Sequence, residues 1–118
     1  MLITSVCECV EDDFSARASG ELRARQLVVE GTCVCPRAGH TLRLEPGNPG
    51  INPDPTELVL RLVIDAPEVG PTVMTRTPVR YEATVGPERE RVVIRVPDQP
   101  AITLPIIGDG DGYEASAS

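Results

Sequence analysis

Apolar and polar residues alternate along most of this chain, a pattern typical of β-strands with one buried face. The clearest run places Leu58, Leu60, Leu62 and Ile64 on one face, with charged residues among those on the other. Comparable runs predict strands over residues 2–10, 14–18, 27–35, 41–45, 79–85, 92–96 and 102–106. Residues 73–77 are a weaker candidate, and no segment has a convincing helical period. The pattern therefore predicts an all-β protein without substantial helix.

Turn-forming residues separate the predicted strands. The chain has 12 prolines and 10 glycines, and segment 46–55 combines prolines, glycines and asparagines. Short strands with a turn signal roughly every 8–12 residues are typical of sandwiches and barrels. We expect residues 1–107 to form a single antiparallel β-sandwich of about 7–8 strands, packed like immunoglobulin or fibronectin domains. Pro105 predicts an edge position for the last strand, and residues 108–118 are predicted to be a flexible tail.

Composition changes this picture mainly by excluding partners. The formal net charge is −7, and the only aromatic residues are two tyrosines and one phenylalanine. Both the cations that neutralise phosphates and the rings that stack on bases are scarce, which disfavours nucleic-acid binding. No run is long and apolar enough to span a membrane, and the N-terminal residues lack the features of a signal peptide. We therefore expect a cytoplasmic protein that binds neither nucleic acid nor membranes.

The one chemically specific feature is a pair of Cys-x-Cys motifs, Cys7 with Cys9 and Cys33 with Cys35. Residues i and i+2 of a strand share a face, so each pair projects its sulfur atoms together. If the two strands are antiparallel neighbours, a single register places Cys7 opposite Cys35 and Cys9 opposite Cys33. A predicted strand around Phe14 lies between the motifs in the sequence, which leaves open whether they meet in space.

Three arrangements of these cysteines remain open. They can pack in the core as reduced thiols, or form one or two cross-strand disulfides in an oxidising compartment. They can also bind a metal, since thiolates hold zinc, Cu(I) or an iron–sulfur cluster. His40 follows Cys35 by five residues and is a candidate replacement ligand, although a histidine in a turn is more often exposed. The candidate metal ligands are Cys7, Cys9, Cys33 and Cys35.

Charged clusters supply weaker candidates. Residues 109–114 resemble part of a calcium-binding loop but lack its more distant glutamate, so we expect a flexible acidic tail instead. Residues 11–13 are three adjacent carboxylates, expected in a solvated turn. Four charged residues are expected on the outer face of a hairpin, where ion pairs contribute little: Arg89, Glu90, Arg91 and Arg95.

No combination of nucleophile and base is typical of an enzyme, because His40 is the only histidine and no nucleophile-elbow or phosphate-binding glycine motif occurs. We therefore expect a non-catalytic module that binds a protein partner, or a second copy of itself, through loops or a sheet edge. Segments 46–55 and 67–71 are the expected contact loops. The alternative is a redox-thiol protein, or a protein that binds zinc or copper through the four cysteines.

Overall fold

The structure is a computed structural model that describes residues 7–21, 23–48, 50, 53–67 and 73–108. Over these residues the chain forms seven strands and no helix, which confirms the all-β prediction. The strands are β1 (Glu8–Glu21), β2 (Ala24–Cys35), β3 (Thr41–Pro46), β4 (Glu57–Asp65), β5 (Thr75–Val85), β6 (Arg91–Arg95) and β7 (Ile102–Gly108). The predicted tail lies outside the described residues, apart from Gly108.

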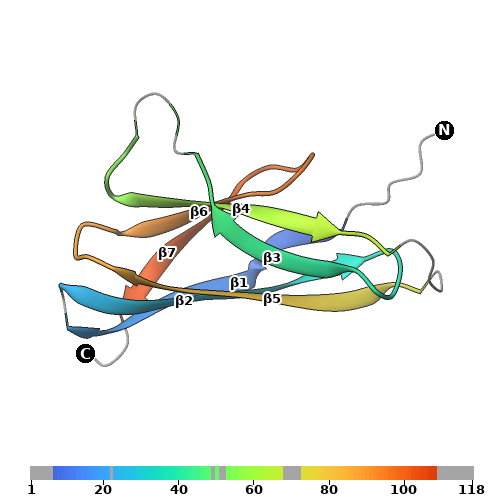
Figure 1. Ribbon diagram of the computed structural model, residues 1–118, viewed down its shortest axis with the longest axis horizontal. Coiled ribbons are helices and arrows are strands. Elements are labelled where there is room, and N and C mark those ends of the chain that lie inside the picture. The colour runs from blue at the N-terminus through green and yellow to red at the C-terminus, as the bar shows by residue number, and fades with distance from the viewer. Residues whose placement is uncertain (1–6, 22, 49, 51–52, 68–72, 109–118) are drawn as a thin grey trace.

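All seven strands belong to one sheet, in the order β3-β4-β6-β7-β1-β2-β5 (Figure 1). β1, β2 and β5 are the longest strands and run side by side along one side of the molecule. β3 and β5 stand at the two ends of the strand order, yet they lie next to each other without backbone pairing. The sheet is therefore nearly closed into a barrel. Immunoglobulin-like or fibronectin-like sandwich packing is not confirmed.

The sheet is mixed, so the prediction of a purely antiparallel sheet is wrong. β4 pairs with β6 in parallel, and β1 pairs with β7 in parallel. The four other pairs are antiparallel. Both parallel pairs join strands that are not consecutive in the chain. The alternation of side chains along a strand is the same for both directions of pairing, so the sequence pattern carries no signal that distinguishes them.

β7 connects the two halves of the sheet. Ile102 to Pro105 pair with β6, and Ile106 to Gly108 pair with β1. Pro105 therefore lies in an interior strand, which corrects the prediction that it marks an edge. Proline removes a backbone donor, and it is accommodated here because the β1 pairing begins only at the next residue.

The core consists of inward-facing side chains from alternate strand positions. Many of them belong to the predicted alternating runs, and Leu58 and Ile64 pack against this core while remaining partly buried. Burying such side chains removes apolar surface from water, which is the main favourable term in folding. The largest side chains that are essentially fully buried include Leu27, Val29, Leu60, Leu62, Val92 and Ile94.

β1 contains a bulge, and this irregularity merges two predicted strands into one. Cys9 pairs with Cys33 and Phe14 with Gly31, so five steps along β1 match two steps along β2. The residues of β1 between these two pairs, 10–13, are all exposed. A Cβ atom at Gly31 would overlap the Phe14 ring, so the ring occupies space that only glycine leaves free. The bulge changes the inward positions of β1 from odd to even numbers.

Candidate functional site

Two disulfides cross-link the start of β1 to the end of β2. Cys7 bonds to Cys35 with a Cα–Cα distance of 4.0 Å, and Cys9 bonds to Cys33 with a Cα–Cα distance of 4.5 Å. The exposed fraction of each cysteine is at most 9%. The predicted register is therefore confirmed. The strand around Phe14 does not separate the motifs, because it is the continuation of β1 itself.

His40 is buried beside these disulfides, which corrects the expectation that a histidine in this turn is exposed. Its exposed fraction is 6%. The turn that carries it includes Gly39, whose φ of 99° suits glycine. The His40 Nδ1 atom lies 3.0 Å from the Arg37 carbonyl oxygen. A carbonyl only accepts hydrogen bonds, so Nδ1 carries the proton and donates it. The Nε2 atom is buried and has no hydrogen-bond partner among the described residues.

The sulfur atoms of Cys7 and Cys35 and a ring nitrogen of His40 all lie within 4.8 Å of one another. Thiolate sulfur and neutral imidazole nitrogen are the preferred protein ligands of zinc. In the disulfide form the two sulfur atoms are bonded to each other. Only the reduced form offers thiolates. Cys9 and Cys33 lie two residues away on the same face and supply further sulfur atoms.

Gln99 holds the beginning of β1 in place. Its Nε2 atom donates to the Cys7 carbonyl at 2.6 Å, and its Oε1 atom accepts the Cys9 N–H at 3.1 Å. Gln99 lies in the turn between β6 and β7, where Asp98 has a positive φ of 58°. The side chain thus acts like a short strand that pairs with β1 before β7 reaches it. Gln99 was not among the predicted site residues, because no motif in the sequence identifies it.

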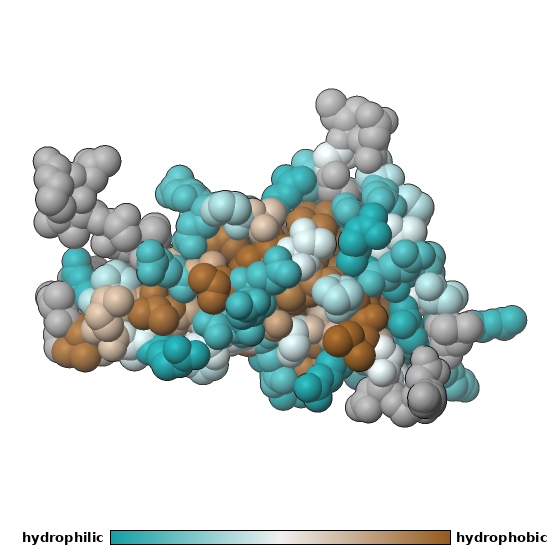
Figure 2. All heavy atoms as spheres, turned by 180° about the vertical axis from the view of Figure 1, so that it is seen from behind, coloured by the Kyte–Doolittle hydropathy of each residue, from teal (hydrophilic) through white to brown (hydrophobic). Residues whose placement is uncertain are grey.

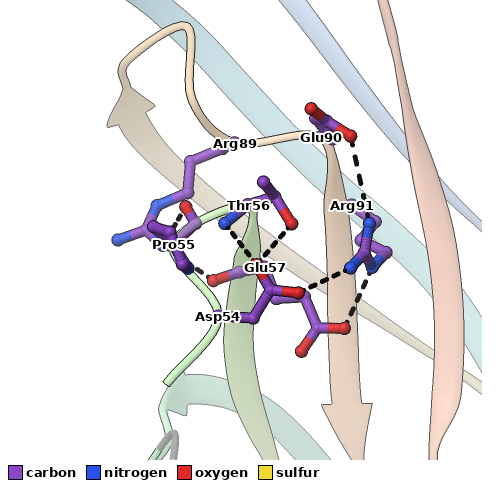
Figure 3. Close-up of polar contacts among 7 residues, drawn as sticks. All are labelled: Asp54, Pro55, Thr56, Glu57, Arg89, Glu90 and Arg91. Carbon is purple, nitrogen blue, oxygen red and sulfur yellow. Dashed lines mark hydrogen bonds and ion pairs between the residues drawn. The ribbon is translucent and has the colours of Figure 1, made fainter. Parts of the chain in front are cut away.

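The opposite end of the barrel is held by arginine side chains. Arg25, near the start of β2, donates from Nη2 to the carbonyl oxygens of Gly86 at 3.0 Å and Arg89 at 2.8 Å. Arg89 donates from Nη1 to the carbonyl oxygens of Pro55 at 2.9 Å and Glu57 at 2.7 Å (Figure 3). The two guanidinium groups therefore tie the β5–β6 turn to β2 and to the start of β4.

Asp54 orders the segment that leads into β4 (Figure 3). Its Oδ1 atom accepts hydrogen bonds from the Thr56 N–H at 2.9 Å and the Thr56 hydroxyl at 2.7 Å. Its Oδ2 atom accepts a hydrogen bond from Arg91 at 2.8 Å. The hydroxyl and amide of Thr56, followed by the charge of Arg91, hold the pKa of Asp54 below its usual value.

The arginines of this hairpin do more than form the weak, exposed ion pairs expected from the sequence. Glu90 and Arg95 are exposed, as expected, whereas Arg89 and Arg91 are partly buried. Arg91 also bonds to Glu57 at 2.9 Å, so it bridges two acidic residues.

The remaining candidates gain little support. Residues 11–13 are exposed in the β1 bulge, and none of them takes part in an ion pair between described residues. Residues 109–114 and most of the 67–71 connection lie outside the described residues. Loop 46–55 is described in part, and a hollow of about 400 Å³ lies at its base between Pro46, Asp54 and Arg89.

No helix formed by the described residues is long and apolar enough to cross a membrane. The chain matches no protein-family model, no curated protein and no solved structure.

Proposed function

We propose that this protein is a non-catalytic interaction module that pairs through the free edge of β5 with the same strand of a second copy. The observation that carries this proposal is the position of β5 at the end of the sheet. β5 has 11 residues, and β3, which lies beside it, has six. β3 is therefore too short to cover the whole edge, and the uncovered backbone groups are available to another strand.

The side chains of β5 support an open edge. Tyr81 and Ala83 face inward but are only partly buried, which indicates that the barrel wall is incomplete beside them. Pro78 is exposed in the middle of the strand. Proline lacks a backbone donor and is compatible with a strand that has a partner on one side only.

The charges on the outer face of β5 favour self-pairing. Arg80 and Glu82 are both exposed, and they contact each other at 2.7 Å within the strand. When two copies of β5 pair antiparallel about Tyr81, Arg80 lies opposite Glu82 of the second copy, and the reverse pair forms as well. Opposite charges at facing positions stabilise antiparallel strands, and like charges destabilise them. The strand is thus complementary to itself in this register.

Other surfaces give weaker support for an interface. On the face turned away from the viewer of Figure 1, apolar groups are interrupted by hydrophilic side chains (Figure 2). The large apolar side chains that are more than half exposed are Val10, Val73, Met74 and Ile107. Val73 and Met74 immediately precede β5, so a strand added to β5 would lie near them.

A non-catalytic role also agrees with the position of His40. It is the only histidine in the chain, it is buried, and its Nδ1 proton is donated to the Arg37 carbonyl. It is therefore not presented on the surface as a general base.

The oligomeric state tests this proposal. We expect the oxidised protein to form a dimer whose dissociation is visible by sedimentation velocity across a concentration series. Glu82→Arg places like charges opposite each other twice in the symmetric pair, and we expect it to raise the dissociation constant about tenfold. The double swap Arg80→Glu with Glu82→Arg restores opposite charges and should restore the dimer.

Glu30→Gln is the matched control. It removes the 3.1 Å contact between Glu30 and Arg80 without changing the charges that face the second copy. We expect it to leave dimerisation unchanged. A protein that is monomeric at all concentrations, or a Glu82→Arg variant that dimerises normally, would overturn the proposal.

A further inference from the structure

We propose that reduction of the two disulfides creates a zinc site. Its ligands are Cys7, Cys35 and His40, and the fourth ligand is a cysteine of the neighbouring pair, Cys9 or Cys33. This inference does not depend on the pairing of β5. It rests on the donor atoms that β1, β2 and the turn after β2 bring together at one end of the barrel.

The geometry suits the ion. The three donor atoms already lie within 4.8 Å of one another. Zinc–sulfur bonds of about 2.3 Å and zinc–nitrogen bonds of about 2.0 Å place the ligand atoms of a tetrahedral site roughly 3.5–3.8 Å apart. Once a sulfur–sulfur bond is broken, the two sulfur atoms separate from bonding distance to about that spacing. Cys9 and Cys33 are not part of this 4.8 Å group, so the fourth ligand requires one of their side chains to rotate toward the other three after reduction.

The side chain of His40 gives independent support for a metal ligand at this position. A buried polar atom normally has a hydrogen-bond partner, and the His40 Nε2 atom has none within the part of the chain that the structure describes. The Nδ1–H of His40 is donated to the Arg37 carbonyl. Histidines that bind metals usually donate their other ring N–H to a carbonyl or carboxylate, which fixes the tautomer with a free lone pair on the ligand nitrogen. His40 therefore has the outer hydrogen bond of a metal ligand and a lone pair without a partner.

The doubling of the disulfides supports the same conclusion. Cys9–Cys33 closes a loop with a sequence separation of 24 residues, and Cys7–Cys35 closes nearly the same loop with a separation of 28. A disulfide stabilises mainly by restricting the unfolded chain, so the second bond adds much less than the first. The second pair of cysteines is therefore partly redundant as a cross-link, which leaves its sulfur atoms available for a role as metal ligands.

A dithiol reductant can open both disulfides. Each disulfide takes up two electrons and two protons and becomes two thiols, while one equivalent of the dithiol becomes a cyclic disulfide. Zinc then binds the three ligating cysteines as thiolates and releases their protons to solvent. Because the ligands come from β1, β2 and the turn that follows, the metal keeps this end of the barrel cross-linked after the disulfides are lost. The protein would thus remain linked at this point in either redox state.

Metal titration of the whole chain tests the proposal. The protein is reduced with a phosphine under argon, which consumes one phosphine and one water for each disulfide. Co²⁺ is then added as a spectroscopic probe and displaced with Zn²⁺. We expect one tetrahedral Co²⁺ per chain, with sulfur-to-cobalt charge-transfer bands, and no tight binding to the oxidised protein. Absence of a tetrahedral Co²⁺ spectrum from the reduced protein would overturn the proposal.

Variants that remove equal numbers of thiols identify the ligands. Cys7→Ala with Cys35→Ala should abolish stoichiometric binding, whereas Cys9→Ala with Cys33→Ala should only weaken it. His40→Gln should weaken binding at least about tenfold and shift the ligand-field bands. Circular dichroism of each oxidised variant checks that it is folded, because every variant keeps at least one disulfide. Equal losses in the two cysteine variants, or an unchanged spectrum and affinity in His40→Gln, would show that the site is not the one proposed.

Discussion

The two ends of this barrel are fastened by different chemistry. At one end, Cys7–Cys35 and Cys9–Cys33 join neighbouring strands covalently, and Gln99 holds the first strand by two hydrogen bonds. At the other end, Arg25 and Arg89 donate to carbonyl oxygens in turns. At the first end the strands already pair through their backbones, and the disulfides stabilise the fold by restricting the conformations of the unfolded chain. The second end has turns, where the arginine donors add to backbone hydrogen bonds such as the 3.4 Å bond from the Arg89 N–H to the Gly86 carbonyl.

This difference predicts which conditions affect each end. The disulfide end responds to reductants, whereas the arginine end responds to changes in charge. Arginine suits the second role because its planar group stays protonated and presents several donors in a fixed geometry. Cysteine and arginine substitutions can therefore separate the contributions of the two ends to stability.

Removing both disulfides should have the largest effect. Alanine at all four cysteine positions should lower the free energy of unfolding by about 3–5 kcal/mol relative to the oxidised protein. Removing one disulfide should cost about 2 kcal/mol or less, because the other bond still closes nearly the same loop. Urea denaturation with far-UV circular dichroism measures both values. Losses of the two single-disulfide variants that add up to the loss of the four-alanine variant would contradict the shared-loop explanation.

Arg25→Met should have an intermediate effect. The substitution removes the Arg25 hydrogen bonds to the carbonyls of Gly86 and Arg89, and we expect it to lower the free energy of unfolding by about 1–3 kcal/mol. Hydrogen exchange should become faster in the β5–β6 turn and remain unchanged near Cys9 and Cys33. Arg25→Lys is the matched control for charge, because its ammonium keeps the charge without the forked donors. A lysine variant as stable as the original protein would show that charge alone suffices.

Acid should produce the smallest effect, and at the arginine end this effect should come from Asp54. The pKa of Asp54 is lowered in the folded protein, so its stabilising contribution is complete above the pKa of the unfolded chain, near 4. That contribution disappears as the pH falls through the lower, folded pKa. We expect an NMR titration to show loss of the Thr56 amide hydrogen bond below about pH 4. Asp54→Asn should remove this pH dependence, and a Thr56 amide that is unaffected by acid would contradict the assignment.

Strands and cysteine register follow from local pattern, and these parts could be predicted. The alternation from Leu58 to Ile64 identifies β4, because a period of two requires only that one face be buried. The Cys-x-Cys spacing gives the register of the disulfides for the same reason. The bulge also has a signal in the sequence. The inward positions change from odd at Cys9 to even at Phe14, which requires extra residues in a continuous strand.

Features that depend on distant parts of the chain could not be predicted in this way. The parallel pairs β4–β6 and β1–β7 depend on which strands become neighbours, and the alternation of apolar and polar residues contains no information about neighbours. Gln99 contacts the start of β1 across more than ninety intervening positions. The burial of His40 depends on how the turn after β2 folds back over the disulfides. Each is a property of tertiary structure rather than of a local segment.

The pairing of β1 with β7 also bears on how the chain reaches this structure. Ala16 pairs with Ile106, so one edge of β1 stays unpaired until β7, the last of the seven described strands, has been synthesised. Contacts between such distant residues carry a large loop-closure cost, and folds dominated by them form slowly. A nascent chain would expose that edge of β1 after the β1–β2 hairpin has formed, and unpaired edges promote aggregation. We therefore expect the yield of folded protein to depend on how quickly β7 docks against β1.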